Sequence, residues 1–278
     1  RIPAALCGVF GFKPSRNLLP PFYGFVDPTG LCVVNCLSTT VEDSAAFLDV
    51  LLGRDYALDA PPPDSLLAQS AAAPTALRIR YCVSSRACVV DPEVERAVLD
   101  TARALAELGH HVEEGAALDA ELEDFLPLWQ RMAANMPLPG DGSCEPTTRW
   151  LRAQGKLVPS HRAQQLTHEL AARVLGWFGD ADAWLTPTVG PHAPRIGAHL
   201  KLEDPATRFL SLTPLGAFTA PYNVSGQPAA SVPAGLSSQG VPIGVQLAAP
   251  PGRDALLLAL CAQLERARPW PGRAPLDG

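Results

Sequence analysis

Lysine is scarce in this sequence, and the basic residues that it does contain are not clustered. Of the 22 basic residues, only three are lysines, at positions 13, 156 and 201, and the arginines are spread along the chain without a basic stripe. The formal net charge at pH 7 is −6. Because nucleic acids and anionic membrane surfaces select clustered Lys and Arg, the composition predicts neither as a partner.

Long hydrophobic runs and an initial methionine are also missing. No run of about 18 apolar residues occurs, so no segment is predicted to span a bilayer. The first residues show no charged region, apolar region and cleavage site in succession, so they are not expected to form a signal peptide. The first methionine is Met132. We therefore expect the chain to be a fragment or a processed product.

The seven cysteines do not form a recognisable framework. They are odd in number, scattered, and include no C-x-x-C pair. Disulfide frameworks are typical of small secreted domains, whereas this chain has 278 residues. We expect free, mostly buried thiols in a reducing compartment, and therefore a cytoplasmic protein.

What is present indicates a globular α/β protein. The chain is 47% hydrophobic and 18% charged, which is enough to bury a core in one large domain or two small ones. Residues 77–83 alternate as a strand, Asp91 and Pro92 open an amphipathic helix that Gly109 ends, and 111–113 begin a second strand. This β-α-β pattern favours parallel pairing in an α/β sheet.

Other segments complete the expected fold. Residues 226–249 are predicted to form a hairpin, and Thr40 is expected to cap a helix that follows it. Leu6 to Phe12 is predicted to be an extended segment that packs near the sheet centre, with close backbone approach at its glycines. Further helices are expected at about 123–136, 146–154 and 160–178. Together these patterns predict one domain with a mixed twisted sheet and helices on both faces.

Motifs of other enzyme classes are not found. The sequence contains no G-x-S-x-G elbow, H-E-x-x-H, P-loop or G-x-G-x-x-G. His161 and His168 share one helix face, but two imidazoles are too few for a metal site, which needs three or four ligands. The pair His110 and His111 is interpreted in the same way. No metal site is therefore expected.

The opening stretch carries a family resemblance. Residues 1–15 read RIPAALCGVFGFKPS. They resemble the segment after the nucleophile in the amidase signature family of serine amidases, where G-G-S-I-R-x-P-A and a small residue precede G-x-x-G-x-K-P-[ST]. Arg1 aligns with the arginine of that pattern, so the resemblance places the nucleophilic serine two residues before it. The base lysine of the family lies far upstream of the nucleophile, so Lys13 is expected to be a structural cation.

Further stretches extend the resemblance over nearly the whole chain. They are DAWLTPT at 182–188, PHAPRIG at 191–197, FTAPYNVSGQPAASVPAG at 218–235 and VPIGVQL at 241–247. The resemblance is weakest over 55–180. It implies that residues 1–278 are the C-terminal portion of a single amidase-signature domain, in which 55–180 form a variable region of helices and substrate loops.

The chemistry that the resemblance implies is amide hydrolysis without a cofactor. The family uses a Ser–cis-Ser–Lys triad with backbone N–H groups that bind the oxyanion, and all of these would lie outside residues 1–278, which we expect to be inactive alone. Arg1 is expected to order the loop of the nucleophile through an ion pair. The candidate residues of the substrate pocket are Trp129, Tyr222, Asn223 and Gln227, each of which also has a structural interpretation as a core aromatic, a turn residue or a buried amide.

Three functions stay open at this point. The first is an amidase that acts on a small linear amide. The second is a non-catalytic homologue or partner chain, and the third is an A-type subunit of a glutaminyl-tRNA amidotransferase, which requires partner subunits. A homodimer also stays open.

Overall fold

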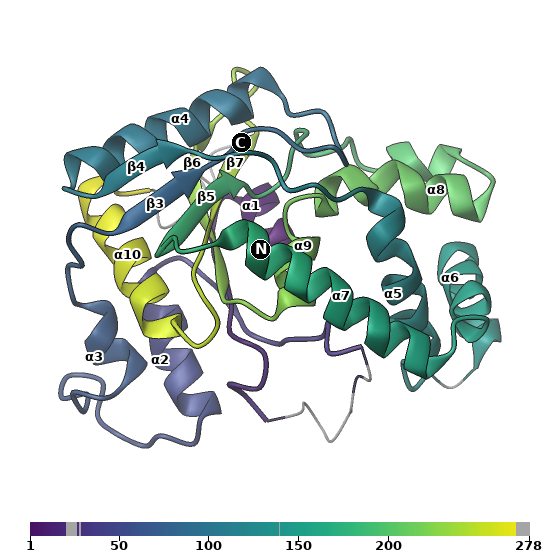
Figure 1. Cartoon of the computed structure of the whole chain (residues 1–278), viewed down its shortest axis with the longest axis horizontal. Coiled ribbons are helices and arrows are strands. Elements are labelled where there is room, and N and C mark those ends of the chain that lie inside the picture. Colours follow the sequence, from purple (N-terminus) through teal and green to yellow (C-terminus); the bar gives the residue numbers. More distant parts are fainter. Residues whose placement is uncertain (21–26, 28, 139, 271–278) are drawn as a thin grey trace.

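The computed structural model describes residues 1–20, 27, 29–138 and 140–270. These residues form a seven-stranded sheet with the strand order β2-β1-β6-β7-β5-β3-β4 (Figure 1). β3 is parallel to β4 and β5, and the other neighbouring strands are antiparallel. The predicted α/β class with a mixed sheet is confirmed. The strands are β1 (Phe10–Lys13), β2 (Leu37–Ser38), β3 (Arg78–Tyr81), β4 (His111–Glu114), β5 (Ala183–Pro187), β6 (Ala229–Leu236) and β7 (Pro242–Ala248).

The parallel half of the sheet follows the predicted β-α-β pattern. The helix α4 (Pro92–Glu107) joins β3 to β4, and the carboxylate of its N-cap residue Asp91 accepts a hydrogen bond from the backbone N–H of Glu93 at 2.8 Å. The apolar stripe of α4 packs against the sheet, and the polar residues of α4 lie on the opposite side of the helix. β5 pairs in parallel with β3. The segments 77–83 and 183–188 therefore contribute to the same sheet, as predicted.

The antiparallel half contains the predicted hairpin. β6 and β7 pair from Ala229↔Ala248 to Leu236↔Pro242, and the turn between them is closed by the backbone N–H of Ser237, which donates to the carbonyl of Val241 at 2.8 Å. β1 pairs with the other side of β6. β6 and β7 are therefore internal strands. The first four residues of β6 are buried, and so is every residue of β7 after Pro242.

The opening segment differs from the expectation of a single extended stretch. Residues Ile2–Cys7 form the helix α1, which ends at Gly8 in the left-handed conformation with φ of 66°, and β1 begins two residues later. A proline in the first turn and the two alanines after it favour a helix. The predicted close approach is present, because a Cβ on Gly11 would lie 2.5 Å from the Cβ of Ala4. The segment also packs near the sheet centre as predicted, since α1 contacts β6 and β7.

Side chains alternate along the strands and so face two layers of helices. On one face, residues such as Phe10 and Leu247 pack with α2 (Val41–Leu51), α4 and α10 (Asp254–Ala267). On the other face, Trp184 packs with Tyr222 of α9 (Ala220–Ser225) and with Phe178, the last residue of α7 (Ser160–Phe178). Helices therefore cover both faces, as predicted. The short helix α3 (Leu66–Ser70) contacts α2 and α10.

Further helices lie at one end of the molecule, away from α2, α3 and α10 (Figure 1). They are α5 (Leu122–Asn135), α6 (Pro146–Lys156) and α8 (Pro205–Leu212), with 3₁₀ turns η2 (Asp141–Ser143), η3 (Ala198–Lys201) and η4 (Thr213–Gly216). The helices predicted near 123–136, 146–154 and 160–178 are confirmed. Within the part of the chain that the structure describes, no helix combines the length and apolar character that crossing a membrane requires.

The cysteines agree only in part with the expectation. All seven lie in the described residues and are free thiols, as predicted. Only Cys82 and Cys261 are buried. The prediction that most are buried is wrong, because the other five lie in loops or at the end of α1 and not on the core face of a regular element.

Candidate active site

The guanidinium of Arg1 is held by two segments that are distant from it in the sequence, α9 with its N-cap residue and β7. One nitrogen, Nη1, donates to the carbonyl of Thr219 at 3.1 Å and to Oε1 of Gln246 at 2.7 Å, and Nη2 donates to Oδ1 of Asn223. Burial lowers the pKa of Arg1 to about 9, and the nearby Tyr222 opposes that shift. The guanidinium of Arg1 therefore stays charged at neutral pH and is held in a fixed position beside α9 and β7.

Gln246 fixes this arrangement from the middle of β7. Its side chain is fully buried. While Oε1 accepts from Arg1, Nε2 donates to the carbonyl of Phe218 at 2.8 Å and to Oγ1 of Thr186 at 3.2 Å. Each polar atom of the amide thus has a partner, as burial requires. The amide connects Arg1 to β5 and to the loop before α9.

Asn223 completes the contacts of Arg1. Its amide nitrogen donates to the carbonyl of Leu31 at 2.9 Å while its oxygen accepts from Arg1. The guanidinium of Arg16 holds the end of the same helix, because its Nη2 donates to the carbonyls of Asn223 and Val224 at 2.8 and 2.7 Å. Burial lowers the pKa of Arg16, and Asp27 opposes that shift. Both ends of the Asn223 amide are therefore engaged within the fold.

Lys13 and Ser15 follow on β1 and just beyond it. Lys13 is buried, and its Nζ donates to the carbonyl of Pro14 at 2.8 Å. Burial, and then the charge of Arg1, lower the pKa of Lys13 well below its ordinary value. Ser15 is bound to Asp254 at the start of α10 through both its backbone N–H and its hydroxyl. These contacts attach the chain just after β1 to the start of α10.

Two cavities adjoin the Arg1 contacts. The larger has a volume of about 270 Å³ and an apolar lining from α1, α5, α8 and η4, in which Phe125, Trp129 and Leu215 are prominent. The smaller, of about 30 Å³, is lined by Tyr222, Trp177 and Thr186 among others. Both are lined by Ala87, Phe125 and Ala217. Thr219, whose carbonyl accepts from Arg1, also lines the larger cavity.

The structure brings most of the candidate residues into this region. Trp129 lines the larger cavity and Tyr222 the smaller one, while Asn223 binds Arg1. The hydroxyl of Tyr222 is buried without a hydrogen-bond partner among the described residues, and burial raises its pKa. Burying a hydroxyl without a hydrogen-bond partner costs free energy. A hydrogen bond between Tyr222 and a group bound in the smaller cavity would offset that cost.

Gln227 lies apart from the cavities. It is fully buried, its Nε2 donates to the carbonyl of Ala249 at 3.1 Å, and its Oε1 accepts from the hydroxyl of Ser225 at 2.8 Å. It lines neither of the two cavities. The amide therefore connects the start of β6 to the chain after β7.

Two residues of the Arg1 network were not predicted. Gln246 stands in VPIGVQL, where a polar residue within an apolar strand is the signal that could have identified it. Arg16 follows the opening motif in a loop, and its acceptors at the end of α9 are more than two hundred residues away. No local pattern could have indicated that contact.

Comparison with known proteins agrees with the motifs. The family model described as Amidase matches residues 1–258. The chain is 35% identical to a protein of Mycobacterium tuberculosis that is provisionally named amidase AmiC, and 34% identical to the 6-aminohexanoate-cyclic-dimer hydrolase of Pseudomonas sp. strain NK87. These matches cover 97% and 99% of this chain but 59% and 62% of the relatives, so the chain spans about three fifths of their length.

A solved structure shows the same arrangement of elements. The 6-aminohexanoate cyclic dimer hydrolase complexed with substrate superimposes with a TM-score of 0.81 at 31% sequence identity. The superposition covers 99% of this chain and 64% of that one. The fold of the described residues is therefore that of the corresponding part of this enzyme.

Proposed function

Because the chain belongs to the amidase family, we propose that the protein hydrolyses linear amide bonds of small, uncharged substrates through an acyl-serine intermediate. The observation that carries the proposal is the position of Arg1 beside an apolar cavity. Thr219 accepts a hydrogen bond from Arg1 and also lines that cavity. Residues 1–278 would form the C-terminal portion of a single amidase domain.

The proposed reaction divides the work between this chain and residues outside it. Under this proposal the nucleophilic serine would precede Arg1 by two positions, and the bridging serine, the base lysine and the oxyanion donors would also lie outside residues 1–278. The serine hydroxyl attacks the amide carbonyl, its proton passes to the base, and the amine leaves with a proton before water hydrolyses the ester. Arg1 would hold the turn that bears the serine.

The cavity determines which substrates fit this proposal. The residues that line it in the described chain are apolar or hydroxyl-bearing, and none has an ionisable side chain. A charged acyl group would lose its hydration there without gaining a partner. Its volume of about 270 Å³ suits a small group. We expect Trp129 and Tyr222 to contact the substrate, whereas Asn223 and Arg1 keep the site in position.

An assay on a series of amides tests the proposal. The protein that includes the serine before Arg1 is compared on neutral aliphatic amides, aromatic amides and amides with a carboxylate on the acyl group. We expect turnover of the neutral compounds and its loss when that serine is replaced by alanine. Retention of turnover after this replacement would contradict the proposed nucleophile. Absence of turnover on all the amides would favour a non-catalytic homologue or a subunit that requires partners.

A tryptophan comparison tests the cavity. Trp129→Ala removes an aromatic wall, and we expect kcat/KM for an amide with a bulky apolar acyl group to fall about ten-fold or more. The matched control is Trp270→Ala, because Trp270 donates to the carbonyl of Thr39 and lines neither cavity near Arg1. If both variants lower kcat/KM equally, the cavity is not the substrate site.

The surroundings of the protein are part of the same proposal. Free thiols at all seven cysteines suit a reducing compartment, and we propose a cytoplasmic protein that acts on a small molecule. Its net charge of −6 and dispersed arginines fit such a substrate better than a nucleic acid.

A further inference from the structure

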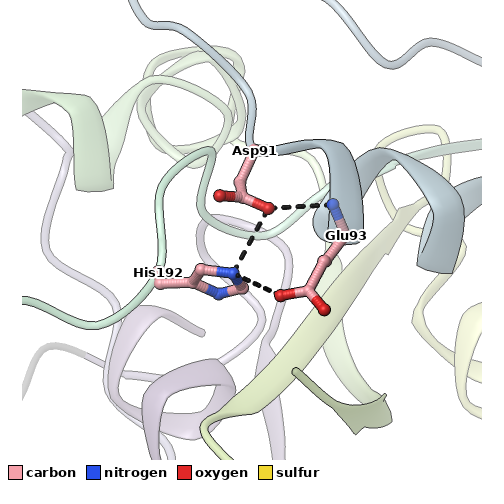
Figure 2. Close-up of side chains that lie close together, drawn as sticks. All are labelled: Asp91, Glu93 and His192. Atoms are coloured by element: carbon pink, nitrogen blue, oxygen red, sulfur yellow. Dashed lines mark hydrogen bonds and ion pairs between the residues drawn. The ribbon is translucent and has the colours of Figure 1, made fainter. Parts of the chain in front are cut away.

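Three side chains with metal-binding groups converge at the start of α4. Asp91 and Glu93 come from the first turn of that helix, and His192 comes from the loop after β5 (Figure 2). Nε2 of His192 lies 3.2 Å from Oδ1 of Asp91 and 3.1 Å from Oε2 of Glu93. Figure 2 shows both carboxylates directed at the same ring nitrogen.

The backbone around the cluster is fixed by several hydrogen bonds. The backbone N–H of Asp91 donates to the carbonyl of Gly190 at 3.0 Å, which attaches the loop that bears His192 to the start of the helix. Oδ1 of Asp91 accepts from the backbone N–H of Glu93 at 2.8 Å. Oε1 of Glu93 accepts from the backbone N–H of Ser238 at 2.9 Å. Ligands of metal sites are typically oriented by such hydrogen bonds.

The spacing of the three ligand atoms fits a small tetrahedral cation. Ligands bound to zinc at about 2.0–2.1 Å in a tetrahedron lie about 3.3 Å from one another. The two distances from His192 Nε2 are 3.2 and 3.1 Å, and all three ligand atoms lie within 4.8 Å of one another. The side chains are partly exposed, with His192 at 25%, Glu93 at 28% and Asp91 at 32%. Solvent can therefore reach the site and supply a fourth ligand.

We propose that Asp91, Glu93 and His192 bind one Zn²⁺ ion, with water as the fourth ligand. The imidazole favours zinc over Mg²⁺ and Ca²⁺, which prefer oxygen ligands throughout. The ion would fasten the loop after β5 to α4 and, through the Glu93–Ser238 bond, to the β6–β7 turn. This site is independent of the proposed amide hydrolysis. No local pattern predicted this site, because Glu93 and His192 are 99 positions apart.

Zinc binding by the intact protein tests the site. The exposed thiols of Cys7 and Cys32 are first alkylated, because thiolates compete for zinc. The metal-free protein is then titrated with Zn²⁺ against a fluorescent chelator. The variants are His192→Ala and Asp91→Asn, the second of which keeps a good N-cap residue for α4. His168→Ala is the matched control, because His168 is exposed on α7.

The outcomes separate the proposed site from the alternatives. We expect one equivalent of Zn²⁺ in the unchanged protein and in His168→Ala, and binding weakened ten-fold or more in His192→Ala and Asp91→Asn. Zn²⁺ should also raise the melting temperature of the unchanged protein but not of His192→Ala. Equal binding by the unchanged protein and His192→Ala would place zinc on other groups and overturn the proposal. Absence of binding would leave the cluster as contacts between His192 and the two carboxylates alone, which also overturns it.

Discussion

Replacing Gln246 by leucine removes the amide that connects Arg1 to the sheet. Three hydrogen bonds are lost, one with the charged Arg1 and two with the neutral partners Phe218 and Thr186. A bond to a charged group contributes about 1.5–3 kcal/mol and a neutral one about 0.5–1.5 kcal/mol. The variant should therefore lower the free energy of unfolding by about 2.5–6 kcal/mol, reduced somewhat by the apolar side chain of leucine.

Gln227→Leu is the matched control for this variant. Gln227 is equally buried, but its two hydrogen bonds are neutral and do not involve Arg1. We expect it to cost about 1–3 kcal/mol. Urea unfolding followed by circular dichroism measures both free energies. If the protein is an amidase, Gln246→Leu should also lower kcat in the folded state because Arg1 loses its anchor, whereas Gln227→Leu should leave kcat unchanged.

Two results would refute this reasoning. A loss of less than about 1 kcal/mol in Gln246→Leu would mean that the three bonds contribute nothing net to stability. An equal fall of kcat in the two leucine variants would mean that activity follows general stability and not the position of Arg1.

Three other predictions rest on separate features. Gly244→Ala should lower the free energy of unfolding by about 1–3 kcal/mol, because the added Cβ would lie 2.7 Å from a Cβ of α1. Gly176→Ala should not lower it, because a Cβ there would meet nothing within 4 Å. Equal effects of the two variants in urea unfolding would contradict this packing. Residues 1–278 expressed alone should show no amide turnover, and turnover that depends on a residue within them would show that the active site is misplaced. The pKa of Asp141 is lowered from 3.8 to about 2, mainly by Lys156. The stabilising contribution of Asp141 is therefore complete above the unfolded pKa and disappears as pH falls through 2. Asp141→Asn should remove that part of the acid unfolding curve.

The elements that the sequence predicted well have signals within a few residues. Asp91 and the proline after it indicate where α4 begins, and the short turn at 237–240 indicates the β6–β7 hairpin, because capping and turn geometry depend on neighbours in the chain. The opening segment was interpreted less well. Its glycines suggested an extended stretch, but Gly8 ends a helix, and Gly11 makes room for that helix on the sheet.

Only those residues of the candidate site that lie in recognisable motifs could be predicted from the sequence. Tyr222 and Asn223 lie in a dense motif, and the structure places both beside Arg1 or its cavity. Gln227 lies in the same motif, yet its amide bonds only to other parts of the fold. The contacts of Gln246 and Arg16 depend on which strands become neighbours. That information arises from the whole sheet and not from any stretch of sequence.

The position of β7 has a consequence for the order in which the chain can fold. β7 is the strand that joins β6 on one side to β5 on the other, so the strands β1, β2 and β6 meet β3, β4 and β5 only through it. Its residues 242–248 are synthesised after the other six strands of the described sheet, and Arg1 reaches its partner Gln246 across 245 positions. Contacts between such distant residues slow folding. On a ribosome, the two parts of the sheet would have to wait for β7, and the surroundings of Arg1 would be among the last to form.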